Sequence, residues 1–104
     1  MVTTFGYVDQ AALDSAVRRV ERDFSPEVVH IRYSVENNHY GDPSISFRIL
    51  VRDEAAPVKR LVELWRTITV ALRNEARTYE NGLQAYFTFR SISEQQELGD
   101  PDWD

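Results

Sequence analysis

The chain has 104 residues, of which 42% are hydrophobic, 28% charged and 12% aromatic, a composition typical of one ordinary globular domain. This composition excludes collagen-like and low-complexity proteins. The absence of cysteine excludes disulfides and thiol chemistry, and no apolar run reaches the ~20 residues of a membrane helix. The formal net charge of −5 argues against a general nucleic-acid binder, although eleven of the twelve basic residues are arginine. The first residues do not form a signal peptide, so we expect a cytoplasmic protein of bacterial type.

Residues 1–8 are β-prone but short and interrupted by Gly6, which fits either an edge strand or an ordered arm. From Asp9, a suitable N-cap, the apolar period becomes helical. The helical stripe consists of Leu13, Ala16, Val17, Val20 and Phe24. Ser25-Pro26 should end this helix, because the residue before proline is disfavoured in the α region.

Residues 27–36 and 44–53 alternate strictly and are separated by turn-forming residues 37–43, which predicts an antiparallel hairpin. In the first strand we place Val29, Ile31, Tyr33 and Val35 on the inner face, with Val28, His30, Arg32 and Ser34 on the other. In the second strand Ile45, Phe47, Ile49 and Val51 face inward, and Ser46, Arg48, Leu50 and Arg52 face outward.

Pro57 suits the first turn of a long amphipathic helix that continues to about Thr78, with Asn81-Gly82 after it. Its core stripe is predicted to be Val58, Leu61, Val62, Trp65, Ile68, Leu72 and Ala76. Residues 83–92 form a third strand with Ala85, Phe87 and Phe89 inward and Tyr86, Thr88 and Arg90 outward.

These elements predict an α+β fold, a two-layer sandwich of order (β)αββαβ in which two helices cover one face of a small, mostly antiparallel sheet. The fold is ferredoxin-like if residues 2–7 pair as a strand. We assign residues 1–92 to a single domain and residues 93–104 to an acidic C-terminal tail. The pattern does not determine the strand order.

The second face of the sheet gathers arginines, and both predicted helices lie on the other face. The interaction residues that we single out are Arg32, Arg48, Leu50, Arg52, Tyr86 and Arg90 on this face, with Trp103 in the tail. Three interpretations compete: a solvated face, a protein interface of a homo-oligomer or a cognate partner, and a site for RNA or single-stranded DNA. Only Tyr86 offers an exposed aromatic ring on this face, which weakens the nucleic-acid interpretation.

The tail contains five acidic residues and no basic one, and a tail of this kind is often a frayed end. Trp103 is unusual in such a segment, and an acidic peptide with one aromatic anchor complements an arginine-rich face. We therefore hypothesise that the tail docks on the arginines, either in the same chain or on a neighbour.

The hairpin loop places His39 and Asp42 near Glu36, a combination that could bind a metal or act in acid–base catalysis. Turn formation explains the loop without a ligand, and the chain lacks a paired-histidine motif, a phosphate-binding glycine loop and a nucleophile elbow. The sequence thus predicts no metal, no cofactor and no enzymatic activity.

The IRYS strand at residues 31–34, the Gly41-Asp42-Pro43 turn, Phe47-Arg48 and the closing segment 86–94 resemble a loosely defined group of small uncharacterised prokaryotic proteins. Genes of that group lie near toxin–antitoxin or defence genes of the HEPN or nucleotidyltransferase type. The resemblance implies a partner-binding accessory role without catalysis.

Overall fold

The computed structural model describes residues 9–103, apart from the side chain at position 58. The elements in chain order are α1 (Gln10–Asp23), β1 (Val28–Asn37), β2 (Pro43–Val51), the 3-10 turn η2 (Asp53–Ala55), α2 (Val58–Glu75), β3 (Gln84–Ser91), α3 (Ile92–Leu98) and the 3-10 turn η3 (Pro101–Trp103). The predicted α+β class is confirmed. The predicted N-terminal strand at residues 2–7 lies outside the described residues.

The three strands form one sheet in the order β1-β2-β3. The predicted hairpin is confirmed, because β1 and β2 pair antiparallel. β3 pairs with β2 in parallel, and α2 provides the crossover between them. The sheet is therefore mixed rather than mostly antiparallel, and β2 and β3 are direct neighbours, whereas the ferredoxin-like order places another strand between them.

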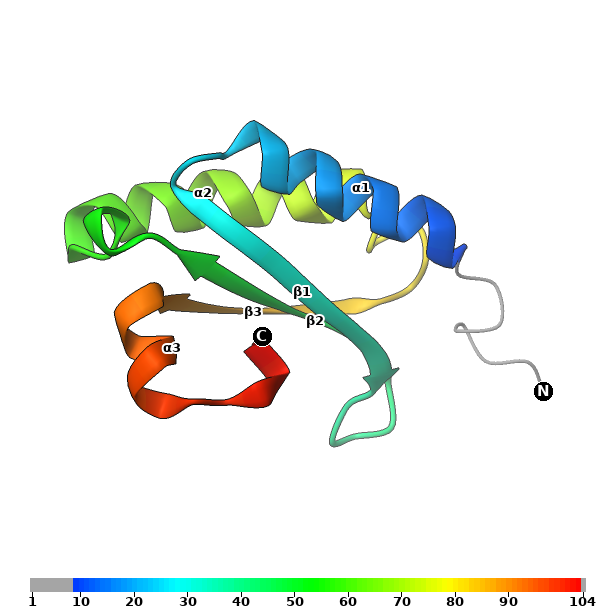
Figure 1. Cartoon of the computed structure of the whole chain (residues 1–104). Helices are drawn as coiled ribbons and strands as arrows, with labels where there is room; N and C mark the ends of the chain where they lie inside the picture. The colour runs from blue at the N-terminus through cyan, green and yellow to red at the C-terminus, as the bar shows by residue number, and fades with distance from the viewer. Residues whose placement is uncertain (1–8, 104) are drawn as a thin grey trace.

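Helices α1 and α2 pack on one face of the sheet, and α3 and η3 lie on the opposite face (Figure 1). The core lies between the two long helices and the sheet. Its centre is β2, where Ile45, Phe47 and Ile49 are completely buried and Phe47 stacks on Phe87 with ring centroids 5.3 Å apart. Four residues of the predicted stripe of α1 are buried as well (Leu13, Ala16, Val17 and Val20), and Phe24, at the C-cap, is partly buried. Asp9 caps this helix by accepting a hydrogen bond from the backbone of Ala12.

Three predicted inward positions, Val29, Val62 and Trp65, are wrong. A bulge between Val28 and His30 shifts the alternation of β1, so that Val28 is buried and Val29 is exposed. On α2, Trp65 and Val62 are about half exposed instead of lying in the core. The buried positions of this helix include Leu64 and Thr69, which the predicted stripe did not contain.

The helix α3 is the main element that the sequence prediction lacked, because residues 93–104 were treated as a tail. Its signals are present in the sequence. The Ser91 hydroxyl accepts a hydrogen bond from the Glu94 backbone while the Glu94 carboxylate accepts one from the Ser91 backbone, which makes a capping box. Gly99 ends the helix in the left-handed conformation at φ 63°, where glycine is favoured.

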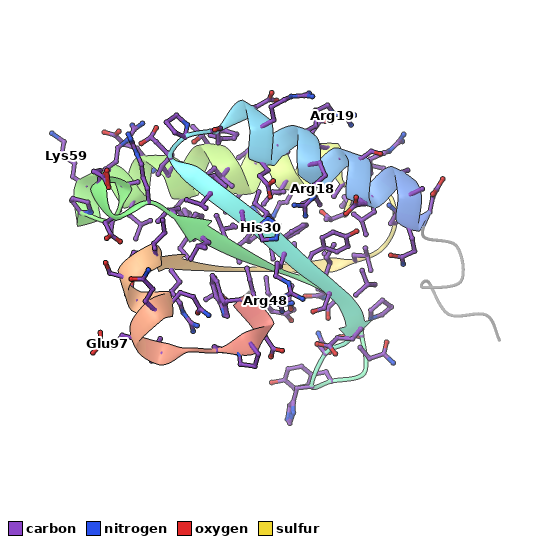
Figure 2. The ribbon with its side chains drawn as sticks, in the orientation of Figure 1. Arg18, Arg19, His30, Arg48, Lys59 and Glu97 are labelled. Atoms are coloured by element: carbon purple, nitrogen blue, oxygen red, sulfur yellow. The ribbon has the colours of Figure 1, made fainter. Side chains whose placement is uncertain are left out.

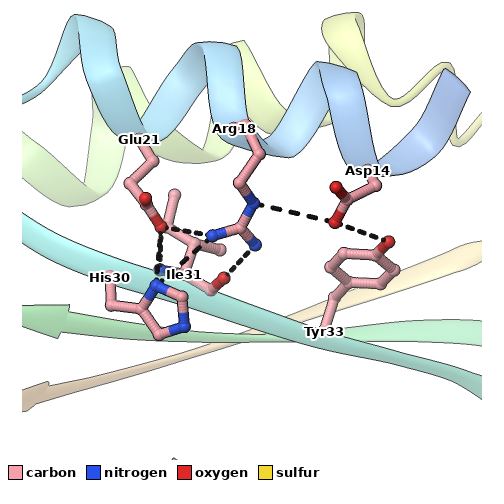
Figure 3. A network of polar contacts seen from close by, with 6 residues as sticks. All are labelled: Asp14, Arg18, Glu21, His30, Ile31 and Tyr33. Atoms are coloured by element: carbon pink, nitrogen blue, oxygen red, sulfur yellow. Dashed lines mark hydrogen bonds and ion pairs between the residues drawn. The ribbon is translucent and has the colours of Figure 1, made fainter. Parts of the chain in front are cut away.

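The outer edge of β1 is capped at Ile31 by two side chains from α1 (Figure 3). The Glu21 carboxylate accepts hydrogen bonds from the Ile31 backbone N–H at 2.7 Å and from Arg18 at 2.6 Å. Arg18 in turn donates to the Ile31 carbonyl. The His30 ring nitrogen Nδ1 lies 2.9 Å from the same Glu21 oxygen, so His30 belongs to this edge network as well as to the outer face of β1. These side chains satisfy backbone groups that an open sheet edge would offer to another strand.

We expect Glu21→Ala to lower the free energy of unfolding by about 1–3 kcal/mol, because the Ile31 N–H loses its acceptor and Arg18 loses its ion pair. Urea unfolding measures this change, and static light scattering tests whether the opened edge promotes aggregation. The control is Asp23→Ala on the same helix, an exposed residue whose removal should change stability by less than about 0.5 kcal/mol. Equal effects of the two substitutions would contradict the edge-closing role.

Candidate functional site: the arginine face

The arginine face consists of Arg32, Arg48, Leu50, Tyr86 and Arg90, which strand alternation places on the side of the sheet away from α1 and α2. Arg32 lies directly opposite Arg48 on the neighbouring strand. Arg90 lies opposite Leu50. Like charges in directly opposed positions destabilise a sheet, so this face requires compensating groups.

The compensating groups come from the C-terminal turn, which we define as residues 100–103. Trp103 is only 5% exposed, and the Arg90 guanidinium lies over its ring at 4.3 Å from the centroid. The Arg90 side chain is itself 18% exposed. A cation stacked on an indole ring and shielded from water is one of the stronger forms of the cation–π interaction.

Each of the three arginines also contacts a polar group of this segment. Arg48 Nε donates to the Asp102 carbonyl at 2.9 Å, and Arg32 Nη1 donates to the Pro101 carbonyl at 3.3 Å. Arg90 donates to Gln95 Oε1 at 2.8 Å and forms an ion pair with Asp100 at 3.7 Å. Figure 2 shows Arg48 on the side of the sheet that the C-terminal turn covers. The hypothesis that the tail docks on the arginines is thus confirmed within the chain, and the frayed-end interpretation is wrong.

Several contacts hold α3 and the C-terminal turn in this position. Asp53, in η2, accepts hydrogen bonds from the hydroxyl and the backbone N–H of Ser93 in the first turn of α3. Gln95 Nε2 donates to the Asp100 carbonyl at 2.6 Å and so ties the helix to the turn that follows Gly99. The segment is therefore anchored at its beginning by Asp53 and at its end by Trp103.

The remaining predicted residues lie apart from this contact. Tyr86 is 45% exposed, and its hydroxyl accepts a hydrogen bond from Asn38 at 3.0 Å. Arg52 follows the end of β2 and lies near Glu27. The pKa of Glu27 is held below its usual value mainly by a hydrogen bond from Arg60, and the positive charges of Arg60 and Arg52 lower it further. The structure therefore assembles Arg32, Arg48, Arg90 and Trp103 into one site and leaves Arg52 and Tyr86 at other positions.

The hairpin loop has the local geometry of a turn. The Asn38 side-chain oxygen accepts hydrogen bonds from the backbone of Tyr40 and of Asp42, and the His39 side chain is exposed. Within residues 9–103, no group of three histidine or acidic side chains is placed to hold a metal ion. No helix in the same part of the chain is long and apolar enough to cross a membrane.

No family model, curated protein or solved structure matches the chain.

We expect the anchor at Asp53 to make the stability of the fold depend on pH. Hydrogen bonds from the hydroxyl and then from the backbone of Ser93 hold the pKa of Asp53 below its usual value. A carboxyl group with a depressed pKa stabilises the folded state above its unfolded pKa, and this contribution is lost as the pH falls through the folded pKa. Asp53→Asn should accordingly lower the free energy of unfolding at neutral pH, and this difference should shrink as the pH falls through the depressed folded pKa of Asp53.

Urea unfolding of both proteins across this pH range tests the expectation. Glu54→Gln is the matched control, because Glu54 is exposed in the same 3-10 turn. A difference between the parent chain and Asp53→Asn that stays constant with pH would show that the Asp53 charge does not contribute.

Proposed function

We propose that the protein is a small non-catalytic interaction module whose arginine face binds an acidic segment with an aromatic anchor on a cognate protein. The observation that carries the proposal is the buried Trp103 beneath Arg90, with Arg48 and Arg32 on the carbonyls of the same turn. In this arrangement the chain's own C-terminal turn occupies the site in the way that a partner segment would.

Arginine suits this role because its planar guanidinium can stack on an aromatic ring while it donates hydrogen bonds to oxygen atoms in its plane. Arg90 does both, since it stacks on Trp103 and donates to Gln95. A partner segment must compete with the C-terminal turn, which a short linker supplies at an effective concentration of roughly millimolar. The module therefore selects partners that present several matching groups at once.

The resemblance to small prokaryotic proteins suggests a setting for this module, in which a cytoplasmic accessory protein binds the product of a neighbouring toxin–antitoxin or defence gene. A single-stranded nucleic acid is the alternative ligand for the same arginines. The ligand that occupies the site within the chain is an acidic peptide with a tryptophan, which supports a protein partner.

The proposal is tested with a labelled peptide of residues 93–104 added to the full-length chain. Trp103→Ala should vacate the site, so this variant should bind the peptide with a Kd of roughly micromolar. The parent chain should bind it about a thousandfold more weakly, because its own turn competes at a roughly millimolar effective concentration. Combining Trp103→Ala with Arg48→Gln and Arg90→Gln should remove binding in a fluorescence-anisotropy titration.

Two controls decide the outcome. A peptide with alanine at its tryptophan position should bind much more weakly, because it lacks the aromatic anchor. Trp103→Ala with Arg22→Gln changes an exposed arginine on α1 instead of the arginine face and should still bind the parent peptide. Binding that survives the loss of Arg48 and Arg90 would overturn the proposal. Tight binding of single-stranded RNA, with a log–log salt slope near −2 for about three phosphate contacts, would favour the nucleic-acid alternative.

A further inference from the structure

A second surface, separate from the arginine face, lies where α2 passes over β3. Leu61, Val62 and Trp65 of α2 and Phe89 of β3 line an apolar groove of about 210 Å³. Trp65 is 49% exposed and Val62 is 45% exposed. Tryptophan at the centre of such a groove is the residue type most enriched at the energetic centres of protein interfaces.

Three positively charged residues lie on α2, the helix that supplies most of the groove. Lys59, Arg66 and Arg73 are spaced by seven residues, or about two helical turns, so they share one stripe of α2. All three are exposed, and none forms an ion pair with the described residues. Arg73 lies over the Phe87 ring at 5.0 Å from the centroid, and Lys59 points away from the fold at the start of α2 (Figure 2). This part of α2 thus presents an apolar groove together with three exposed cations that form no ion pair among the described residues.

The charge pattern distinguishes between two possible occupants. If a second copy packed its α2 antiparallel across Arg66, Lys59 would face the other copy's Arg73 and the two Arg66 side chains would face each other. Like charges juxtaposed across an interface oppose association, whereas a segment that carries carboxylates would neutralise the same stripe. The groove therefore matches an acidic partner better than it matches itself.

We propose that the groove at Trp65 docks an acidic segment of a partner protein, which inserts a bulky apolar side chain between Trp65 and Phe89 and places carboxylates against Lys59, Arg66 and Arg73. This surface is independent of the arginine face, and neither proposal requires the other.

The two tryptophans of the chain allow one experiment to observe both surfaces. Fluorotryptophan labelling of the full-length chain gives one fluorine NMR signal for Trp65 in the groove and one for Trp103 on the arginine face. The probe is a synthetic peptide of glutamates with leucines at helical spacing, and its counterpart carries lysine in place of every glutamate. The acidic peptide should shift the Trp65 signal and leave the Trp103 signal in place, and the basic peptide should shift neither.

Calorimetric titration of unlabelled variants with the acidic peptide then tests the named side chains. Trp65→Ala and Arg66→Glu should each weaken binding about tenfold or more. Val70→Ala is the matched control, since Val70 is 54% exposed on α2 but does not line the groove, and its affinity should equal that of the parent chain.

Each of the following results would overturn the inference: no binding of the acidic peptide, equal binding of the basic one, undiminished affinity in Trp65→Ala, or a Trp65 signal that shifts with protein concentration in the absence of peptide. The last result would identify a second copy as the occupant. A shift confined to Trp103 would likewise overturn it, while leaving the proposed function of the arginine face intact.

Discussion

Arg32 and Arg48 face each other across neighbouring strands, and much of the architecture beyond the sheet can be understood as a response to that repulsion. Water and salt reduce the repulsion on an open face, but the side chains would then have no fixed geometry. The C-terminal turn instead offers two backbone carbonyls, of Pro101 and Asp102, to these arginines. Arg32 and Arg48 are thereby held in defined positions by backbone carbonyls, and neither needs a buried carboxylate as a partner.

Trp103 and the helix α3 fix the position of the C-terminal turn over the arginines. Trp103 is almost completely buried beneath Arg90. Burial of the indole ring and its cation–π contact with Arg90 therefore both stabilise this position of the turn. The helix α3 fixes where the turn begins, because its capping box and the hydrogen bonds of Ser93 to Asp53 determine the direction of the chain after β3. The sheet is consequently covered on both faces over part of its area (Figure 1).

Short-range pattern was sufficient to predict the hairpin, the inward residues of β2 and the grouping of Arg32, Arg48 and Arg90 on one face, because alternation with period two places side chains directly. The parallel pairing of β2 with β3 depends on the path of α2, which no local pattern encodes. The bulge after Val28 reverses two side chains through a single extra residue.

Trp65 and the tail show two different reasons for wrong predictions. Helical spacing places Trp65 on the core stripe of α2, but the packing partners decide burial, and near Phe89 the helix leaves that side open. In the tail the local signals were present, since Ser91 and Glu94 have the spacing of a capping box and Gly99 marks a helix end. The acidic composition of residues 93–104 suggested a frayed end and concealed those signals.

The two proposed binding surfaces differ in whether their cations already have contacts within the chain. Those on the arginine face are compensated by the same chain, so a ligand there has to displace an existing set of contacts. Lys59, Arg66 and Arg73 on α2 have no ion-pair partner among the described residues, so an acidic ligand there would not have to break an existing ion pair. Binding at α2 should therefore depend mainly on complementarity, whereas binding at the arginine face also depends on how firmly Trp103 and Asp53 hold the C-terminal turn.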